Sequence, residues 1–117
     1  MLNNSKLQNA IKLSSKIQAY VPATMHDQPI DNTEYVDRIA TIFSQCFGGA
    51  TCTEALGLWL SGSVGLIRER ITIVFAYCTT DQLKENIDRV VDAMETLKTD
   101  MQQEAIALEI NGEMYFI

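Results

Sequence analysis

The pattern of apolar and polar residues is most pronounced in residues 66–78, LIRERITIVFAYC, which hold the longest β-branched and aromatic run of the chain. Strict alternation at the start of this segment is typical of a half-buried strand. The continuous apolar second half favours a strand that is covered on both faces. We therefore predict that residues 66–78 form the central strand of a small sheet, with helices packed on one face.

Two other segments repeat their apolar residues with the period of a helix. Residues 31–47 begin at Asp31, a good N-cap, and are followed by Gly48, which takes the left-handed C-terminal position without strain. Residues 81–102 follow a cap at Thr79 or its neighbour and carry the longer apolar stripe. A long helix is predicted in each segment, and a short, weaker one in residues 3–15.

The remaining segments alternate as strands do. We predict strands at residues 16–21, 50–61, 104–110 and 113–117. The Asn-Gly pair between the last two is the strongest short-range hairpin signal. After the weak first helix the order is β-α-β-β-α-β plus a C-terminal hairpin strand. This is the order of a ferredoxin-like split βαβ plait, an α+β fold with two helices on one face of an antiparallel sheet.

Length and composition agree with one globular domain. The chain of 117 residues is predicted to be a single domain, in which residues 1–15 are an extension and residues 16–117 the α+β core. No apolar run is long enough for a membrane span, and the N-terminus lacks the apolar core of a signal peptide. Three cysteines without CxxC spacing favour reduced thiols. We expect a cytoplasmic protein without membrane contact.

The net charge of −6 is unevenly distributed. Residues 1–29 sum to +2, and the remaining residues, with six bases and fourteen acids, sum to −8. An acidic body argues against direct nucleic-acid binding, which needs basic patches. It leaves a basic surface on another protein as a partner.

Few side chains are candidates for catalysis. His26 is the single histidine, and it lies in a predicted loop, where most histidines are solvated. No metal-ligand spacing such as CxxC or HExxH occurs. We therefore expect no catalytic residue, no metal and no cofactor, and we predict that the protein is not an enzyme.

An acidic row lies on the predicted long helix. Its spacings of four and three place it along one side of the helix, away from the apolar stripe. The row consists of Asp81, Glu85, Asp88, Asp92 and Glu95. A solvated helix face, partly neutralised by Lys84 and Arg89, would explain it. The sharper interpretation is a partner-binding stripe that docks on a basic nucleic-acid-processing enzyme.

A second candidate surface lies on the predicted sheet. It consists of Trp59, Arg68, Glu69 and Arg70. A cross-strand salt bridge, for example between Glu54 and an arginine, would account for the charges. Because Trp and Arg are frequent interface anchors, these residues are also candidates for sheet-face or dimer contacts, and we expect a homodimer.

The segments FGGATCTEALGLWL, GLIRERITIVFAYC and QQEAIALEINGEMYFI resemble small uncharacterised ferredoxin-like proteins of prophages, plasmids and conjugative elements of Gram-positive bacteria. The layout is also similar to a wider bacterial domain of unknown function. The matching residues are Phe47, Gly48, Gly57, Trp59, Glu69, Gln103 and Glu104. The resemblance covers roughly residues 17–117 and implies carriage on a mobile element. It implies no catalytic residue or ligand.

Three functions follow as hypotheses. The first is a non-enzymatic binding protein that inhibits a host nucleic-acid-targeting defence complex, in the manner of an anti-CRISPR protein, through the acidic row or the sheet face. The second is a small-molecule or nucleotide-binding or sponge protein that uses a dimer cleft near Trp59, Arg68 and Arg70. The third is a small plait-fold enzyme with Glu69 as a base, for which Glu54 is an alternative.

Overall fold

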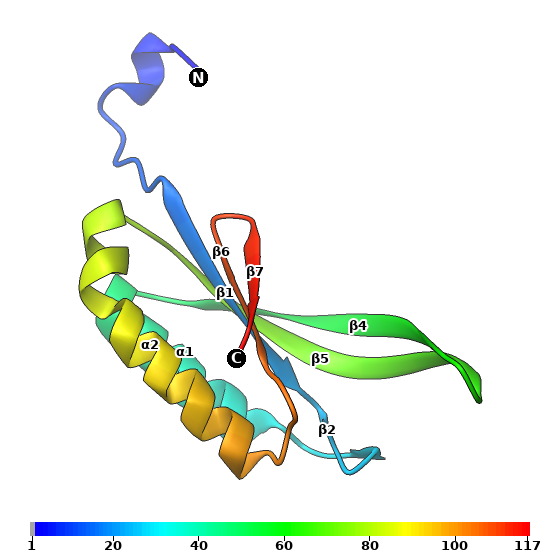
Figure 1. Cartoon of the computed structure of the whole chain (residues 1–117). Coiled ribbons are helices and arrows are strands. Elements are labelled where there is room, and N and C mark those ends of the chain that lie inside the picture. Colours follow the sequence, from blue (N-terminus) through cyan, green and yellow to red (C-terminus); the bar gives the residue numbers. More distant parts are fainter. Residues whose placement is uncertain (1) are drawn as a thin grey trace.

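A five-stranded antiparallel sheet carries two long helices on one face (Figure 1). The computed structural model describes residues 2–117, and its strands lie in the order β4-β5-β1-β6-β7. The strands are β1 (Ser15–Pro22), β4 (Thr51–Ser61), β5 (Gly65–Cys78), β6 (Ala107–Ile110) and β7 (Glu113–Phe116), and the helices are α1 (Thr33–Phe47) and α2 (Thr80–Asp100). The predicted α+β plait with an added hairpin strand is confirmed.

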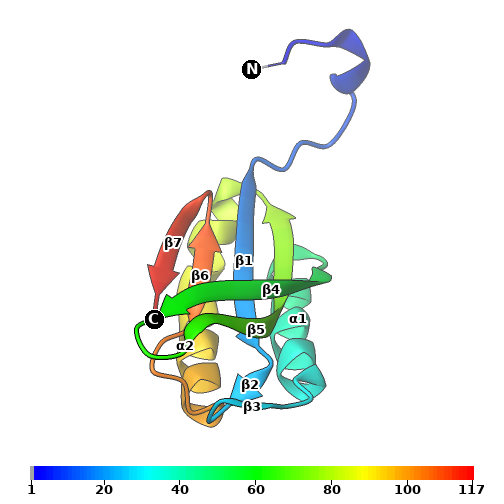
Figure 2. The same ribbon diagram turned by 90° about the vertical axis from the view of Figure 1, so that its right-hand side faces the viewer.

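The first and third strands of the plait are central, as predicted, but β5 is covered on one face only. Val74, Ala76 and Cys78 point to the helices and are buried. Phe75 and Tyr77 point to the opposite face, which no other segment of residues 2–117 covers (Figure 2). The prediction that both faces of this strand are covered is therefore wrong for the described chain. The apolar run arises because one face packs on helices and the other presents apolar side chains to the exterior.

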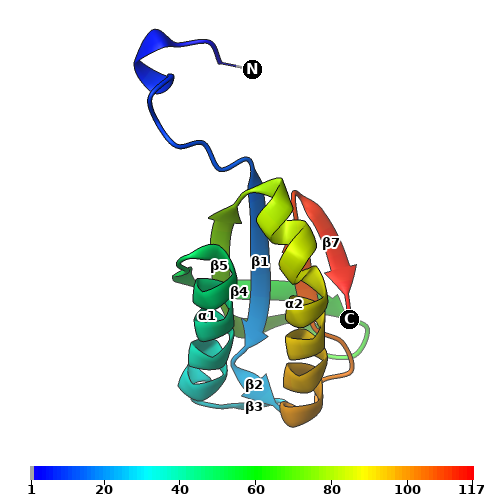
Figure 3. The ribbon, with the colours of Figure 1, turned by 90° about the vertical axis from the view of Figure 1, so that its left-hand side faces the viewer.

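The core lies between the sheet and the two helices, which run side by side across its covered face (Figure 3). Each element contributes its apolar stripe, as the helical and alternating periods require. The largest fully buried side chains are Phe43, Ile17, Ile39, Met94, Leu97, Met101, Leu108, Val21, Val74, Val90 and Cys78. This packing fixes α1 against β1 and β5, and so fixes the position of the α1 N-terminus beside the sheet.

Turn and cap residues end the elements close to the predicted positions. Gly48 closes α1 with φ +90°, a conformation that costs glycine no Cβ clash. Thr79 caps α2 in a capping box with Gln82. Asn111 has φ 51°, as expected for the tight turn between β6 and β7. At the start of α1 the N-cap position belongs to Asn32 rather than to the predicted Asp31.

The predicted helix over residues 3–15 is wrong. Only a 3-10 turn, η1 (Ser5–Leu7), forms there, and none of its residues is buried. Residues 2–14, which we call the N-terminal arm, project away from the sheet and the helices (Figure 1). A short helix needs tertiary packing of its apolar side for stability, and residues 2–14 are all exposed and pack on nothing in the described chain.

The hairpin of β4 and β5 extends beyond the helices (Figure 1). The two strands pair continuously from Thr51–Phe75 to Ser61–Gly65, so the far half of the hairpin has no helix behind it. Below it a small two-stranded ribbon, β2 (Thr24–Met25) and β3 (Gln28–Pro29), connects β1 to α1. The hairpin, this ribbon and the N-terminus of α1 surround an open space on the helix-covered side.

Candidate functional site

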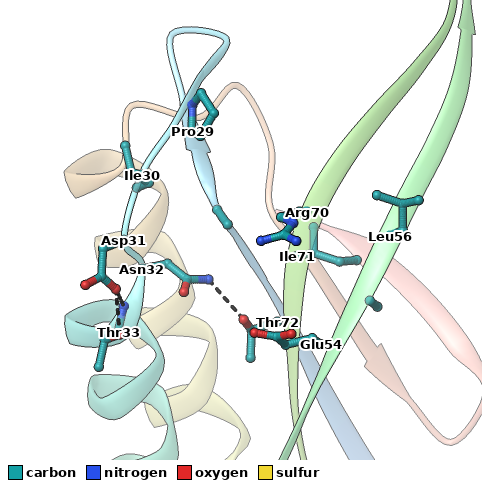
Figure 4. Close-up of a pocket in the computed structure, with 12 residues that line it drawn as sticks. Pro29, Ile30, Asp31, Asn32, Thr33, Glu54, Leu56, Arg70, Ile71 and Thr72 are labelled. Carbon is teal, nitrogen blue, oxygen red and sulfur yellow. Dashed lines mark hydrogen bonds between the residues drawn. The ribbon is translucent and has the colours of Figure 1, made fainter.

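A cleft of about 600 Å³ opens between the N-terminus of α1 and the β4–β5 hairpin (Figure 4). This volume is within the range of small-molecule sites, roughly 300–1,000 Å³. One wall comes from the β2–β3 ribbon and the start of α1, and the other from facing positions of β4 and β5. The lining residues are Ala23, Pro29, Ile30, Asp31, Asn32, Thr33, Glu54, Ala55, Leu56, Arg70, Ile71 and Thr72.

Asn32 holds the two walls of the cleft at a fixed separation. Its side-chain nitrogen donates to the Pro22 carbonyl at 3.2 Å and to the Thr72 hydroxyl at 3.1 Å. One amide thus joins the end of β1, the start of α1 and the middle of β5. The neighbouring Asp31 accepts hydrogen bonds from the Thr33 backbone at 3.0 Å and from its hydroxyl at 2.6 Å. These two bonds orient the Asp31 carboxylate at the rim and lower its pKa.

Charges of both signs line the cleft. Antiparallel pairing sets Glu54 opposite Thr72 and Leu56 opposite Arg70, so Glu54 and Arg70 share one face of the hairpin. Both side chains are exposed. Every ion pair within residues 2–117 involves Arg38, so the predicted salt bridge between Glu54 and an arginine is not formed. The cleft therefore offers two carboxylates and one guanidinium to a ligand.

A smaller hollow of about 250 Å³ continues the cleft along the outer side of β4. It shares Asn32, Thr33, Glu54 and Thr72 with the cleft and adds Val36, Cys52 and Thr53. Burial, and secondarily the nearby Asp37 carboxylate, raises the pKa of the Cys52 thiol. Because the thiolate is the reactive form, Cys52 is poorly suited to act as a nucleophile.

A second, polar pocket of about 350 Å³ lies at the far side of the β2–β3 ribbon. Its residues are Thr24, His26, Asp27, Glu69, Gln102, Gln103, Glu104 and Ala105. His26 is hydrogen-bonded to Gln102, and the Gln103 amide nitrogen donates to the Thr24 carbonyl at 3.0 Å. The pocket brings together Glu69, Gln103 and Glu104, which are distant in the sequence and belong to the motifs that carry the resemblance.

The four residues predicted for one sheet-face surface are divided between two faces. Alternation along β5 puts Glu69 on the open side, where Trp59 also lies, opposite Ile67. Arg68 and Arg70 point to the other side, and Arg70 lines the cleft. A contact surface made of all four side chains is therefore not present within one chain.

The acidic row lies on α2 as predicted. All five carboxylates are exposed, and none of them has an ion-pair partner within the described chain. Arg89, predicted to neutralise Glu85, instead contacts Gln45 and the Cys46 sulfur on α1. The row is thus an exposed negative surface on the helix layer, away from the cleft between α1 and the β4–β5 hairpin.

Sequence reasoning missed the cleft because its residues come from separate segments. Asp31 was recognised only as a helix cap, and Asn32 and Thr72 were given no role. The sequence signal for the cleft was a cluster of polar residues directly before a helix. Such a cluster is also expected where polar residues only cap the helix. In residues 2–117 no three His, Cys, Asp or Glu side chains are grouped so as to hold a metal ion.

The fold and the cleft together define a small α+β plait protein with a mixed-charge cleft of ligand size. No protein-family model matches the sequence, and no curated protein matches it. A phage SAM lyase in complex with S-methyl-5'-thioadenosine has a similar structure, with a TM-score of 0.65 and 15% identity over 92% of this chain and 94% of that chain. The apo state of a phage SAM lyase gives a TM-score of 0.62 and 19% identity, over 88% of this chain and 87% of that chain.

These similarities correct the prediction that the protein is not an enzyme. Both structures named above share the fold over most of their length and are those of a phage SAM lyase, so the absence of familiar catalytic motifs was not a sound basis for excluding an enzyme. Within residues 2–117 no helix is both long enough and apolar enough to cross a membrane.

Proposed function

We propose that this protein cleaves S-adenosylmethionine (SAM) in the cleft and releases S-methyl-5'-thioadenosine. The observation that carries the proposal is the similarity to phage SAM lyase, which covers 92% of this chain and 94% of that chain. The volume and the charges of the cleft support it. The third hypothesis from the sequence, a small plait-fold enzyme, is closest to this function.

The charges of the cleft complement those of SAM. The ligand carries a sulfonium and an ammonium group, both positive, and one carboxylate. Asp31 and Glu54 supply two negative charges, and Arg70 supplies one positive charge. Arg70 is suited to the carboxylate because a guanidinium donates two parallel hydrogen bonds to it. The apolar side chains of Pro29, Ile30 and Leu56 offer a surface to the adenine ring.

The proposed reaction breaks the bond between the sulfonium sulfur and the adjacent carbon of the amino-acid side chain. Both electrons of the bond remain on sulfur, which becomes the neutral thioether of S-methyl-5'-thioadenosine. The carboxylate oxygen of the same amino acid forms the new bond to carbon, so the second product is a lactone and no proton is transferred. No side chain has to accept a proton in this step, so the proposal needs no general base in the cleft.

The test is the formation of S-methyl-5'-thioadenosine from SAM by the purified protein, quantified by mass spectrometry. SAM also decomposes slowly by itself, so the rate with heat-denatured protein is subtracted. Arg70→Gln is expected to lower kcat/KM by roughly 10- to 150-fold, because a hydrogen bond to a charged group contributes about 1.5–3 kcal/mol. Arg68→Gln is the matched control on the same face of β5, outside the cleft, and should retain the activity.

Two outcomes would contradict the assignment. If the wild-type protein forms no S-methyl-5'-thioadenosine above the background, the proposed reaction is wrong. If Arg70→Gln and Glu54→Gln retain full activity while Glu69→Gln abolishes it, the reaction belongs to the second pocket or to a cleft between protomers near Trp59. Circular dichroism of each variant separates loss of activity from loss of folding.

The acidic row supports a second proposal, that the protein also docks on a basic host protein. The supporting observation is five exposed carboxylates without an ion-pair partner in the described chain. In this proposal the protein is carried by a phage or another mobile element, acts in the cytoplasm and inhibits a nucleic-acid-targeting defence complex. Retention of the tagged protein by such a complex at low salt, and its release at raised salt, is the expected result.

A further inference from the structure

The open face of the sheet is unusually apolar for an exposed surface. We define it by the large apolar side chains that point away from the helices: Tyr20, Trp59, Ile67, Ile71, Ile73, Phe75, Tyr77, Met114 and Phe116. They come from β1, β4, β5 and β7 and lie on the face of the sheet without helices, which faces the viewer in Figure 2. The same face also carries Lys16, Gln18, Glu69 and Glu109. Exposed patches of this kind mark interaction sites. The solvent-exposed fractions are 51% for Tyr77 and 75% for Phe116.

The N-terminal arm has the complementary properties. Its large apolar side chains are exposed as well: Leu2, Leu7, Ile11 and Leu13. Within the described chain, residues 2–14 make no hydrogen bond to residues 15–117. The arm contains Lys6 and Lys12 and no acid, which gives it a charge of +2, whereas residues 15–117 hold seven bases and fifteen acids, which gives −8. The opposite net charges favour association of an arm with a body in general, and the apolar side chains on both favour the open face as the place of contact.

The structure directs the arm away from its own open face. At the start of β1 the Lys16 backbone nitrogen donates to the Asn111 side chain at 2.9 Å, and the Asn111 backbone nitrogen donates to the Lys16 carbonyl at 2.9 Å. The chain therefore leaves the sheet past the β6–β7 turn (Figure 2). To reach the open face of its own sheet, the chain would have to reverse its direction near residue 14.

We propose that the N-terminal arm of one protomer packs on the open sheet face of a second copy of this chain. An extended arm of thirteen residues spans about 40 Å, enough to cross the face of a neighbouring body. Exchange of terminal segments between identical chains is a low-cost route to symmetric assemblies. This packing does not depend on SAM cleavage. The arm of a second copy is the segment that would cover the apolar face.

Sedimentation velocity of the full chain tests this arrangement, and the single tryptophan, Trp59, is a second reporter. We expect an assembly of at least two copies, with Trp59 emission shifted to shorter wavelength as protein concentration rises. Leu7→Ser combined with Ile11→Ser should give a monomer and abolish the shift. Both side chains are exposed, so folding should be unaffected. Gln8→Ser combined with Asn9→Ser is the matched control in the same arm and should still assemble.

A mixing experiment distinguishes contact between copies from contact within one chain. The arm variant keeps its sheet face, and a face variant, Tyr77→Ser with Phe116→Ser, keeps its arm. If the arm binds a second copy, the mixture assembles at a concentration where each variant alone is monomeric. A mixture that stays monomeric overturns the proposal. So does a wild-type chain that is monomeric at every concentration, or an arm variant that assembles as the wild type does.

Discussion

Asn32 connects fold and site through one side chain. Its amide nitrogen reaches the carbonyl oxygens of Val21 and Pro22, at 3.4 and 3.2 Å, and the hydroxyl of Thr72. The side chain is half-buried. If Asn32 were removed, its acceptors would be left without this donor at a place that water reaches only in part. The position of the cleft wall therefore depends on an uncharged residue that acts through hydrogen bonds within the protein.

Replacing Asn32 by alanine is expected to lower the free energy of unfolding by about 1–2 kcal/mol, since its part-buried hydrogen bonds to Val21, Pro22 and Thr72 are lost. Asn32→Asp should destabilise at least as much, because a carboxylate would face carbonyl oxygens and cannot donate. Urea denaturation, monitored by circular dichroism, measures both effects. Asn9→Ala in the exposed arm is the control and should not move the midpoint. A stability of Asn32→Asp equal to that of the wild type would show that these bonds contribute nothing.

The roles of single residues were the least predictable part of the sequence. Arg70 was recognised as a possible binding residue, because arginine is a frequent interface anchor. Its neighbours in the cleft, Glu54 and Asp31, were explained by local capping or ion pairing. Only the register between β4 and β5, together with the packing of α1, brings the three together. Residues that lie far apart in the sequence and meet only in the folded chain leave no local sequence pattern.

Elements whose signals are local were predicted well. The N-cap of α2, predicted at Thr79 or its neighbour, is an example: the Gln82 backbone nitrogen donates to the Thr79 hydroxyl at 3.1 Å, and the Thr79 backbone nitrogen donates to the Gln82 side chain at 2.9 Å, which completes a capping box. The Asn-Gly turn and the glycine after α1 belong to the same class. Each depends on a backbone conformation that few residue types favour. The N-terminal arm was mispredicted because its apolar spacing is helical, while helix stability depends on tertiary packing that residues 2–14 do not have within the described chain.

Thr79→Ala is expected to lower the free energy of unfolding by about 1 kcal/mol, the usual effect of removing a helix N-cap. Thr79→Ser retains the hydroxyl and should stay close to the wild type. The two variants differ in one functional group, and chemical denaturation of both measures the effect of the cap directly. Equal midpoints for the alanine and serine variants would show that the α2 N-terminus is held by packing alone.

At the scale of the whole molecule, three surfaces have separate properties. The cleft lies between α1 and the β4–β5 hairpin, the open sheet face is apolar, and the exposed side of α2 is negative. The fold class followed from the order of elements, because that order permits few arrangements of a short antiparallel sheet with two helices. The positions of these three surfaces could not be predicted from the order of elements, because they depend on which side of each strand the helices cover.

The separation of surfaces leads to a prediction about function. Neutralising the centre of the acidic row by Glu85→Gln, Asp88→Asn and Asp92→Asn should abolish capture of a basic partner, because attraction to that partner depends on these charges. The same triple variant should retain SAM cleavage, since none of the three residues lines the cleft.

The variant changes the net charge from −6 to −3, so a control with the same net charge is needed. Asp37→Asn, Glu104→Gln and Glu113→Gln remove three negative charges that lie outside α2. Binding is measured by pull-down over a salt series, and cleavage by the formation of S-methyl-5'-thioadenosine. If the control loses the partner as completely as the row variant does, binding depends on net charge and the row has no specific role. If the row variant loses cleavage while its fold is intact, the two functions share one surface, and the assignment of the reaction to the cleft is wrong.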